Sequence, residues 1–159
     1  MSICFVRIDD RLIHGQIVTA WLKNYQAKNI LIVDELVSKD EFLKNVLQMV
    51  KPSGVDLIIK GTELIEETIS FYEKDAKSTL LLVKNPETAK LIFDCKIALN
   101  KLNVGGMGAN KNRKALYKNV SASEDEIVTL NAIQSSGISV YFQATPNDKQ
   151  VELSSINIK

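Results

Sequence analysis

The sequence predicts an α/β fold: a single three-layer domain in which helices cover both faces of a mostly parallel sheet. Short apolar runs rich in β-branched residues alternate with helical patterns through most of the 159 residues. The runs are continuously apolar, which is typical of parallel strands buried on both faces. No repeat, low-complexity tract or linker interrupts the alternation. We therefore expect residues 1–159 to form one domain with right-handed crossover connections.

Seven apolar runs are the expected strands of the sheet. The first reads ICFVRI, and a helical pattern separates most runs from the next. In chain order the runs are residues 3–8, 30–33, 55–59, 79–83, 102–104, 116–120 and 138–142.

Side chains that can cap helices stand in front of the helical patterns. The first N–H groups of a helix lack partners within the helix, so side-chain oxygens that accept from them mark its start. Ser38 with Glu41, and Ser123 with Glu126, form two possible capping boxes. Five helices are expected. The first covers residues 16–25, the second runs from the Ser38 box to Val50, and the third runs from Thr62 to Phe71. The fourth runs from Asn85-Pro86 to about Asp94, and the fifth runs from the Ser123 box to a stop at Gly137.

Composition and charge exclude several classes of protein. Twenty basic against nineteen acidic residues leave a net charge of +1, too balanced for the phosphate-neutralising surface that nucleic-acid binding requires. The N-terminus lacks the apolar region of a signal peptide, and no segment is long and apolar enough to cross a bilayer, so we expect a cytoplasmic protein. Cys4 and Cys95 are far apart in the sequence and are expected to be small buried residues rather than a disulfide or a zinc site.

The candidate site is RIDDRLIHGQ at residues 7–16, which holds the only histidine, His14. It lies between the end of a strand and the start of a helix, where free N–H groups and the helix dipole favour an anion. A neutral imidazole is a nucleophile toward phosphorus, and the fork of Arg11 suits a phosphoryl group, so phosphohistidine chemistry is feasible. Asp9 or Asp10 can orient Arg11 or one ring nitrogen, and Gly15 gives a bulky group access to the backbone. The alternative is a histidine that only satisfies backbone groups in a loop.

Three further segments have both a functional and a structural interpretation. The glycine-rich residues 103–109 can cradle a phosphoryl group in a nest of N–H groups, although a plain glycine turn is favoured from spacing alone. Lys111, Arg113 and Lys114 form either a docking surface or a solvated charge run. Asp34 and Glu35 either line the cleft or face water.

The sequence resembles the IIB components of the mannose class of the bacterial phosphoenolpyruvate-dependent sugar phosphotransferase system. The resemblance rests on VRIDDRLIHGQIVTAW at residues 6–21 and extends through ILIVDELVSKDEF, LNVGGMGANKNRKALYKNVSASEDEI and FQATPND. It implies a roughly seven-stranded sheet and a phosphocarrier in which His14 accepts a phosphoryl group from a IIA protein and passes it to a sugar. Uptake of that sugar would run through the membrane components IIC and IID, at which this cytoplasmic chain would bind.

The site residues expected from these lines of reasoning fall into two groups. Asp9, Arg11 and His14 match the family's catalytic motif, and Arg11, Gly15, Gln16 and Gly106 are expected to bind the phosphoryl group. No bound metal or nucleotide is expected.

Two other functions remain open at the level of sequence. A phosphatase that works through phosphohistidine also carries a histidine and a glycine after its first strand, but it needs a second histidine, and Ile13 stands where its motif has arginine. A non-catalytic module that binds a nucleotide or an anion through the glycine loop is the other alternative.

Overall fold

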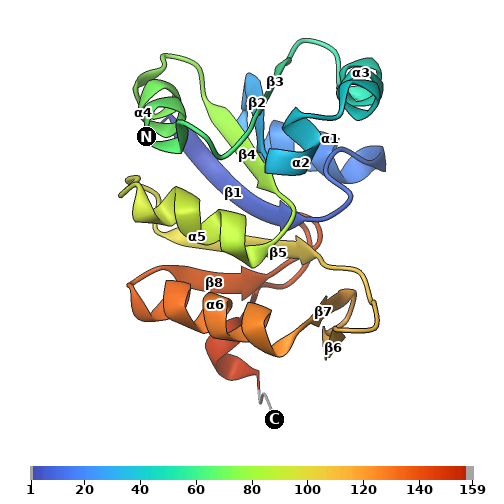
Figure 1. Cartoon of the computed structure of the whole chain (residues 1–159), viewed down its shortest axis with the longest axis vertical. Helices are drawn as coiled ribbons and strands as arrows, with labels where there is room; N and C mark the ends of the chain where they lie inside the picture. The colour runs from blue at the N-terminus through green and yellow to red at the C-terminus, as the bar shows by residue number, and fades with distance from the viewer. Residues whose placement is uncertain (1, 157–159) are drawn as a thin grey trace.

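A seven-stranded sheet forms the middle layer of the protein (Figure 1). The computed structural model describes residues 2–156, apart from the side chains of residues 16 and 17. The strand order is β3-β2-β4-β1-β5-β8-β9, and every pair is parallel except β8 with β9. The strands are β1 (Ile3–Asp9), β2 (Asn29–Val33), β3 (Asp56–Lys60), β4 (Thr79–Val83), β5 (Lys101–Gly106), β8 (Ser139–Phe142) and β9 (Val151–Glu152). The expected mostly parallel, seven-stranded α/β architecture is confirmed.

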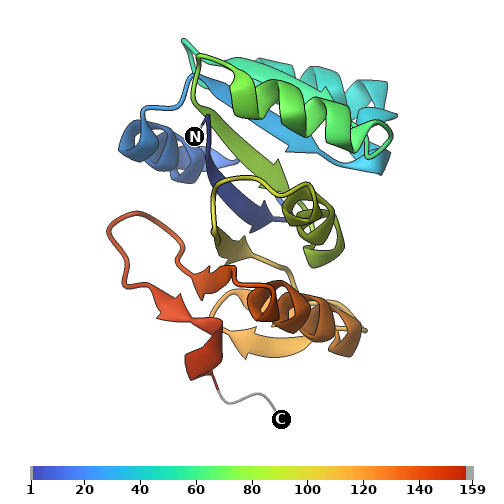
Figure 2. The ribbon, with the colours of Figure 1, turned by 90° about the vertical axis from the view of Figure 1, so that its left-hand side faces the viewer.

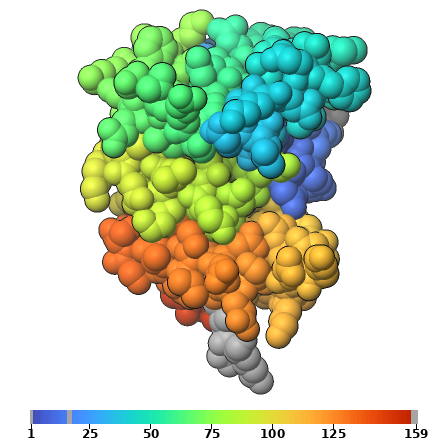
Figure 3. All heavy atoms as spheres, viewed as in Figure 1, coloured from blue at the N-terminus to red at the C-terminus, as the bar shows by residue number. Residues whose placement is uncertain are grey.

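Helices cover both faces of the sheet, and each face has its own apolar core. One core joins the sheet to α4 (Ile65–Lys74), α5 (Pro86–Asp94) and α6 (Glu124–Ser135), and it includes Ile69, Ile92 and Leu130. The other joins it to α1 (Gly15–Tyr25), α2 (Glu35–Ser38) and α3 (Glu41–Val50) through residues such as Trp21 and Leu47. Figure 2 shows α1 on one side of β1 and α5 and α6 on the other, and Figure 3 shows α4, α5 and α6 packed side by side over their face.

Two of the expected helix starts are confirmed in detail. The side chain of Asn85 accepts a hydrogen bond from the N–H of Thr88 at 2.9 Å, and Pro86 is the first helical residue of α5. Ser123 and Glu126 exchange the two hydrogen bonds of a capping box at the start of α6. This helix ends at Ser135, and Gly137 follows it with a φ of +101°, as a helix stop requires.

Two other expected starts are wrong, each for a different reason. Asp40, not Ser38, caps α3 by accepting from the N–H of Leu43 at 3.0 Å, and Ser38 is the last residue of the short α2. The helix expected from Thr62 begins at Ile65, after a left-handed residue at Leu64. Thr62 donates instead to the carboxylate of Glu35.

The strand expected over residues 116–120 is wrong as well. The chain turns at Lys118, which has a φ of +42°. An antiparallel hairpin forms there from β6 (Lys114–Tyr117) and β7 (Val120–Ala122), separate from the main sheet. The turn lacks the glycine from which a tight hairpin is usually predicted in a sequence. The short edge strand β9 was not expected either.

Asp34 and Glu35 both make hydrogen bonds that hold neighbouring segments in place, and of the two only Glu35, whose side chain is 38% exposed, also faces water. Asp34 is buried and caps α2 by accepting from the N–H of Val37 at 2.9 Å. Glu35 accepts from both the N–H and the hydroxyl of Thr62, at 2.9 and 2.7 Å, and ties α2 to the loop after β3.

Glu35 provides a test of this tie at low pH. Hydrogen bonds from Thr62, aided by Lys39, lower the pKa of Glu35 from 4.5 to about 2. A lowered carboxyl pKa stabilises the folded state above the unfolded value, and this stabilisation is lost as the pH falls from 4.5 through about 2. We expect the amide proton of Thr62 to titrate with a midpoint near 2 in an NMR pH series and to lose that titration in Glu35→Gln. A midpoint near 4.5 would show that the tie does not form in solution.

The two cysteines are half-buried rather than buried as expected, and both are free thiols. Burial raises the pKa of each thiol, which disfavours the reactive thiolate. Within residues 2–156, the longest apolar helical stretch falls short of what crossing a membrane requires.

Candidate phosphoryl-transfer site

The candidate site lies in the loop between β1 and α1, at the carboxyl end of the sheet. The next three strands after β1 in the sequence, β2, β3 and β4, all lie on one side of it in the sheet. The later strands β5, β8 and β9 lie on its other side. This change of direction is the topological switch point at which open α/β sheets bind ligands. His14 is the N-cap residue of α1, with extended backbone angles. The expected position of His14, between a central strand and the start of a helix, is confirmed.

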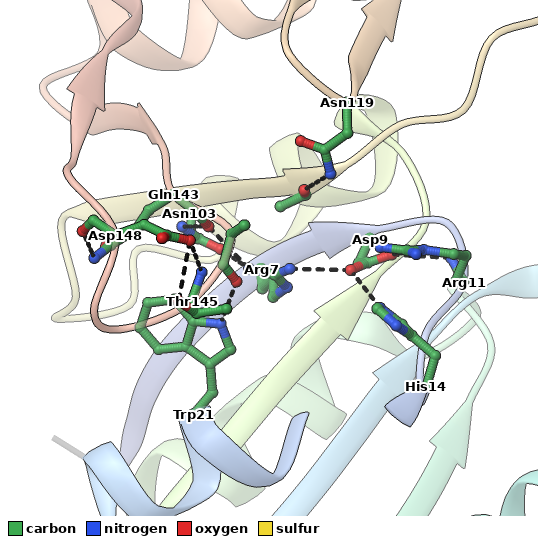
Figure 4. Close-up of polar contacts among 12 residues, drawn as sticks. Arg7, Asp9, Arg11, His14, Trp21, Asn103, Asn119, Gln143, Thr145 and Asp148 are labelled. Atoms are coloured by element: carbon green, nitrogen blue, oxygen red, sulfur yellow. Dashed lines mark hydrogen bonds and ion pairs between the residues drawn. The ribbon is translucent and has the colours of Figure 1, made fainter. Parts of the chain in front are cut away.

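Asp9 is the centre of the site (Figure 4). Its side chain is fully buried at the end of β1. One carboxylate oxygen, Oδ2, lies 2.8 Å from Nε2 of His14 and accepts from Nη2 of Arg7 at 3.1 Å. The other, Oδ1, accepts from the backbone N–H of Arg11 at 3.1 Å and lies 3.5 Å from its Nε. Of the two carboxylates that the sequence left open, Asp9 is the one that contacts both Arg11 and the imidazole.

Arg11 and His14 are the accessible members of this group. The side chain of Arg11 is 53% exposed and that of His14 is 20% exposed, above the buried Asp9. Two arginines against one carboxylate leave the site with a positive charge that favours an anion. Within the described part of the chain, no side chain or backbone group hydrogen-bonds to Nδ1 of His14.

The other expected phosphate-binding residues lie around the same loop. Gly15 begins α1 with a φ of +49°, and the place of its absent Cβ is open space, so the backbone there is accessible. Gly106 ends β5 beside the site, and a Cβ on it would lie 3.1 Å from Oδ1 of Asp9 and 3.4 Å from Nη2 of Arg11. The side chain of Gln16 lies outside the described residues. Binding of a phosphoryl group by these three residues stays a prediction.

The glycine-rich segment is only partly a loop. Gly105 and Gly106 belong to β5, and the N–H of Gly108 donates to Oδ2 of Asp10 at 2.7 Å. Arg113 donates to the same oxygen at 3.3 Å. Asp10 therefore fastens the loop after β5 to the loop after β1.

Arg113 helps to hold these two loops together through its hydrogen bond to Asp10. It is therefore neither a docking residue nor a solvated charge, as the sequence had suggested. Its side chain is only 12% exposed and donates two hydrogen bonds of 2.8 Å to the carboxylate of Glu126. Burial raises the pKa of Glu126, but hydrogen bonds from Arg113 and Ser123 outweigh it and lower the pKa below its usual value. The neighbouring Lys111 and Lys114 are exposed.

Sequence reasoning missed the residues that support Asp9 from beneath. Arg7 is 1% exposed, and its Nη1 donates to Oδ1 of Asn103 at 2.7 Å and to the backbone oxygen of Gln143 at 3.1 Å. Burial lowers the pKa of Arg7, and the nearby charge of Asp9 counteracts this. One signal was available: an arginine inside an apolar strand needs a buried partner.

Comparison with known proteins identifies one family over nearly the whole chain. The family model described as "PTS system sorbose subfamily IIB component" matches residues 3–159. The fructose-specific EIIB component of Bacillus subtilis is 29% identical over 148 residues, which cover 93% of this chain and 91% of that protein. The mannose-specific EIIAB component of Escherichia coli is 27% identical, over 96% of this chain and 47% of that protein.

Solved structures of similar proteins have the same fold. The manxB protein of Thermoanaerobacter tengcongensis is 35% identical with a TM-score of 0.85, over 96% of this chain and 93% of that chain. The IIBSor domain of the sorbose permease of Klebsiella pneumoniae is 27% identical with a TM-score of 0.88, over 96% of this chain and 94% of that chain.

Proposed function

Because this chain belongs to the family of sorbose-subfamily IIB components of the phosphotransferase system, we propose that it carries a phosphoryl group on His14 from a IIA protein to a sugar. Membership of this family identifies the chain as a sugar phosphotransfer component of the phosphotransferase system. The residue that carries the group, the donor and the membrane partners are the finer part of the proposal. One observation carries it: His14 lies at the start of a helix with its side chain 20% exposed and one ring nitrogen held by a buried carboxylate.

The hydrogen bond to Asp9 selects the reacting nitrogen. A carboxylate accepts hydrogen bonds, so Nε2 of His14 carries the proton and the lone pair stays on Nδ1. In the proposed transfer, the Nδ1 lone pair attacks the phosphorus on the donor histidine, the donor P–N bond breaks, and its electron pair returns to the donor ring. In the second step a sugar hydroxyl attacks phosphorus, the P–Nδ1 bond breaks, and the hydroxyl proton passes to solvent.

The magnitudes favour a carrier over a tight binding site. A phosphoryl group carries about −1.5 to −2 charges, and the start of α1 stabilises it by about 0.3–1 kcal/mol. A charge-assisted hydrogen bond from Arg11 adds about 1.5–3 kcal/mol, at the lower end because the side chain is exposed. Each further 1.4 kcal/mol would slow onward transfer about tenfold, so a shallow cradle suits a group that must be passed on.

Membership of the family supports a proposal for the partners. The E. coli relative is named as an EIIAB protein, of which this chain matches 47%, and we propose that a IIA domain is the donor here. One family model matches residues 3–159, so we treat the chain as a single IIB domain. We place it in the cytoplasm, bound to membrane IIC and IID components that present the sugar.

The direct test is phosphoryl transfer with purified components. The chain is incubated with phosphoenolpyruvate, the general phosphotransfer proteins and a IIA protein, and then with transporter membranes and a panel of sugars. We expect acid-labile, base-stable phosphate on Nδ1 of His14 by ³¹P and ¹⁵N NMR, discharged by one sugar. Hydrolysis of phosphomonoesters with turnover would instead support the phosphatase alternative. Binding of nucleotides without phosphorylation would support the non-catalytic module.

Arg11→Lys is expected to slow transfer about tenfold while the protein stays folded. Lysine keeps the charge but loses the fork that binds a phosphoryl group through two N–H donors, and one charged hydrogen bond of about 1.5 kcal/mol corresponds to that factor. The measurement is the rate of labelling from phosphorylated IIA by rapid quench. Lys90→Gln, which removes an exposed charge paired with Asp94 on α5, is the control. Equal rates for Arg11→Lys and the unmodified protein would remove Arg11 from the site.

A further inference from the structure

The least expected side chain near the site is the guanidinium of Arg7. It lies in the central strand β1 and is 1% exposed. Burying a charge is costly unless it is paired and hydrogen-bonded, so an arginine here must be compensated by its surroundings. The groups that Arg7 contacts therefore indicate its role in the site.

The contacts of Arg7 come from three separate segments of the chain. Nη2 donates to Oδ2 of Asp9, while Nη1 donates to Oδ1 of Asn103 on β5 and to the backbone oxygen of Gln143 after β8. The Nδ2 of Asn103 also donates to the oxygen of Gln143, at 3.1 Å. Figure 4 shows these groups as one continuous network beneath the site. Two neighbouring segments thus fix the plane of the guanidinium.

The space that Arg7 occupies exists because residue 105 is glycine. A Cβ on Gly105 would lie 1.9 Å from Cζ of Arg7 and within 2.4 Å of both terminal nitrogens. On its other side, the guanidinium carbon lies 5.8 Å from the centre of the Trp21 ring. Arg7 therefore has one position available, and that position is against Asp9.

The same oxygen of Asp9 serves both Arg7 and His14. Oδ2 accepts from Nη2 of Arg7 and lies 2.8 Å from Nε2 of the imidazole, while Oδ1 is held by the N–H of Arg11. The carboxylate is consequently fixed at both oxygens. Without Arg7, nothing among the described residues would hold Oδ2 in line with the ring.

We propose that Arg7 is a positioning residue for phosphoryl transfer, which orients the Asp9 carboxylate so that the proton of His14 stays on Nε2 and Nδ1 faces the donor. This inference rests on the proposed role of His14. Arg7 is 1% exposed beneath the site and shares Oδ2 of Asp9 with the imidazole, so it acts on His14 through Asp9.

The test reads the tautomer of the single histidine in the unphosphorylated protein. In protein labelled with ¹⁵N-histidine, at a pH where the ring is neutral, we expect the wild type to show the proton on Nε2. In Arg7→Met we expect a mixture of both tautomers and a fall of at least tenfold in the rate of labelling by phosphorylated IIA. Arg7→Lys keeps the charge but cannot bond Asp9, Asn103 and Gln143 together, and it is expected to lie between the two.

A structural control separates positioning from a general loss of stability. Asn29→Ala removes the hydrogen bonds of a buried side chain to Asp75 and Thr79 at the amino end of the sheet, and neither partner contacts Asp9 or His14. It is expected to lower Tm and to keep the wild-type tautomer. A wild-type tautomer and rate in Arg7→Met would overturn the proposal, as would a wild-type protein with its proton on Nδ1.

A milder variant covers the case in which Arg7→Met does not fold. Asn103→Ala removes the 2.7 Å acceptor of Arg7 and leaves every charge in place. We expect it to raise the Nδ1-protonated fraction and to slow labelling several-fold, and an unchanged tautomer and rate would overturn the proposal. The tautomer is measured without phosphate, so this measurement tests the effect of Arg7 on His14 independently of phosphorylation. A failure of His14 to accept a phosphoryl group would overturn only the proposed function.

Discussion

Replacing His14 by glutamine is expected to abolish phosphoryl uptake, the largest functional effect that any single substitution in this chain can have. The chain has one histidine, so no other imidazole can accept the group. Glutamine still has an N–H that can donate to the buried Asp9, so the carboxylate keeps a partner and the fold is expected to survive. The loss would therefore be one of chemistry.

The measurement compares acid-labile phosphate on the unmodified protein and on His14→Gln after incubation with phosphorylated IIA. Far-UV circular dichroism and the unfolding midpoint confirm that the variant is folded. Lys90→Gln, on the exposed face of α5, is a control for the labelling assay. Label that persists in folded His14→Gln would place the phosphoryl group on another residue and refute the assignment.

Local signals made much of the fold predictable. The starts of α5 and α6 depend on hydrogen bonds between residues three apart, Asn85 with Thr88 and Ser123 with Glu126, and such bonds can be read from a sequence. The start of α4 depends on tertiary structure, because Thr62 is engaged by Glu35, 27 positions away. The β6/β7 hairpin was not predicted because its turn at Lys118 adopts a positive φ without a glycine.

The same distinction divides the candidate site. Asp9, Arg11 and His14 lie within six residues of one another, and their spacing at the end of a strand was sufficient to group them. The supports of Asp9 were not predictable in this way, because Arg7 reaches Asn103 and Gln143 across 96 and 136 positions. Only the order of the sheet, in which β5 lies between β1 and β8, brings them together.

Gly105→Ala is expected to have the largest effect on stability. Its methyl group would overlap the guanidinium of Arg7, with 1.9 Å between Cβ and Cζ. Both Arg7 and the β5 backbone are held in the sheet, so the guanidinium must leave Asp9. Breaking a buried ion pair costs about 3–5 kcal/mol, a large part of the 5–15 kcal/mol by which domains are typically stable.

Gly106→Ala is the matched comparison, one residue further along the same strand. Its Cβ would lie 3.1 Å from Oδ1 of Asp9 and 3.4 Å from Arg11, whose exposed end can move by a few tenths of an ångström. The expected loss is about 1 kcal/mol. Denaturant unfolding measures both values, and the single tryptophan, Trp21, reports the move of Arg7 from its ring in the folded state. Equal losses for the two variants would mean that Gly105 is not needed to accommodate Arg7. The predicted difference arises because the methyl group at 105 would overlap a buried charge that cannot move without losing its partner, whereas the one at 106 comes no closer than 3.1 Å to Asp9 and 3.4 Å to Arg11, so shifts of a few tenths of an ångström accommodate it.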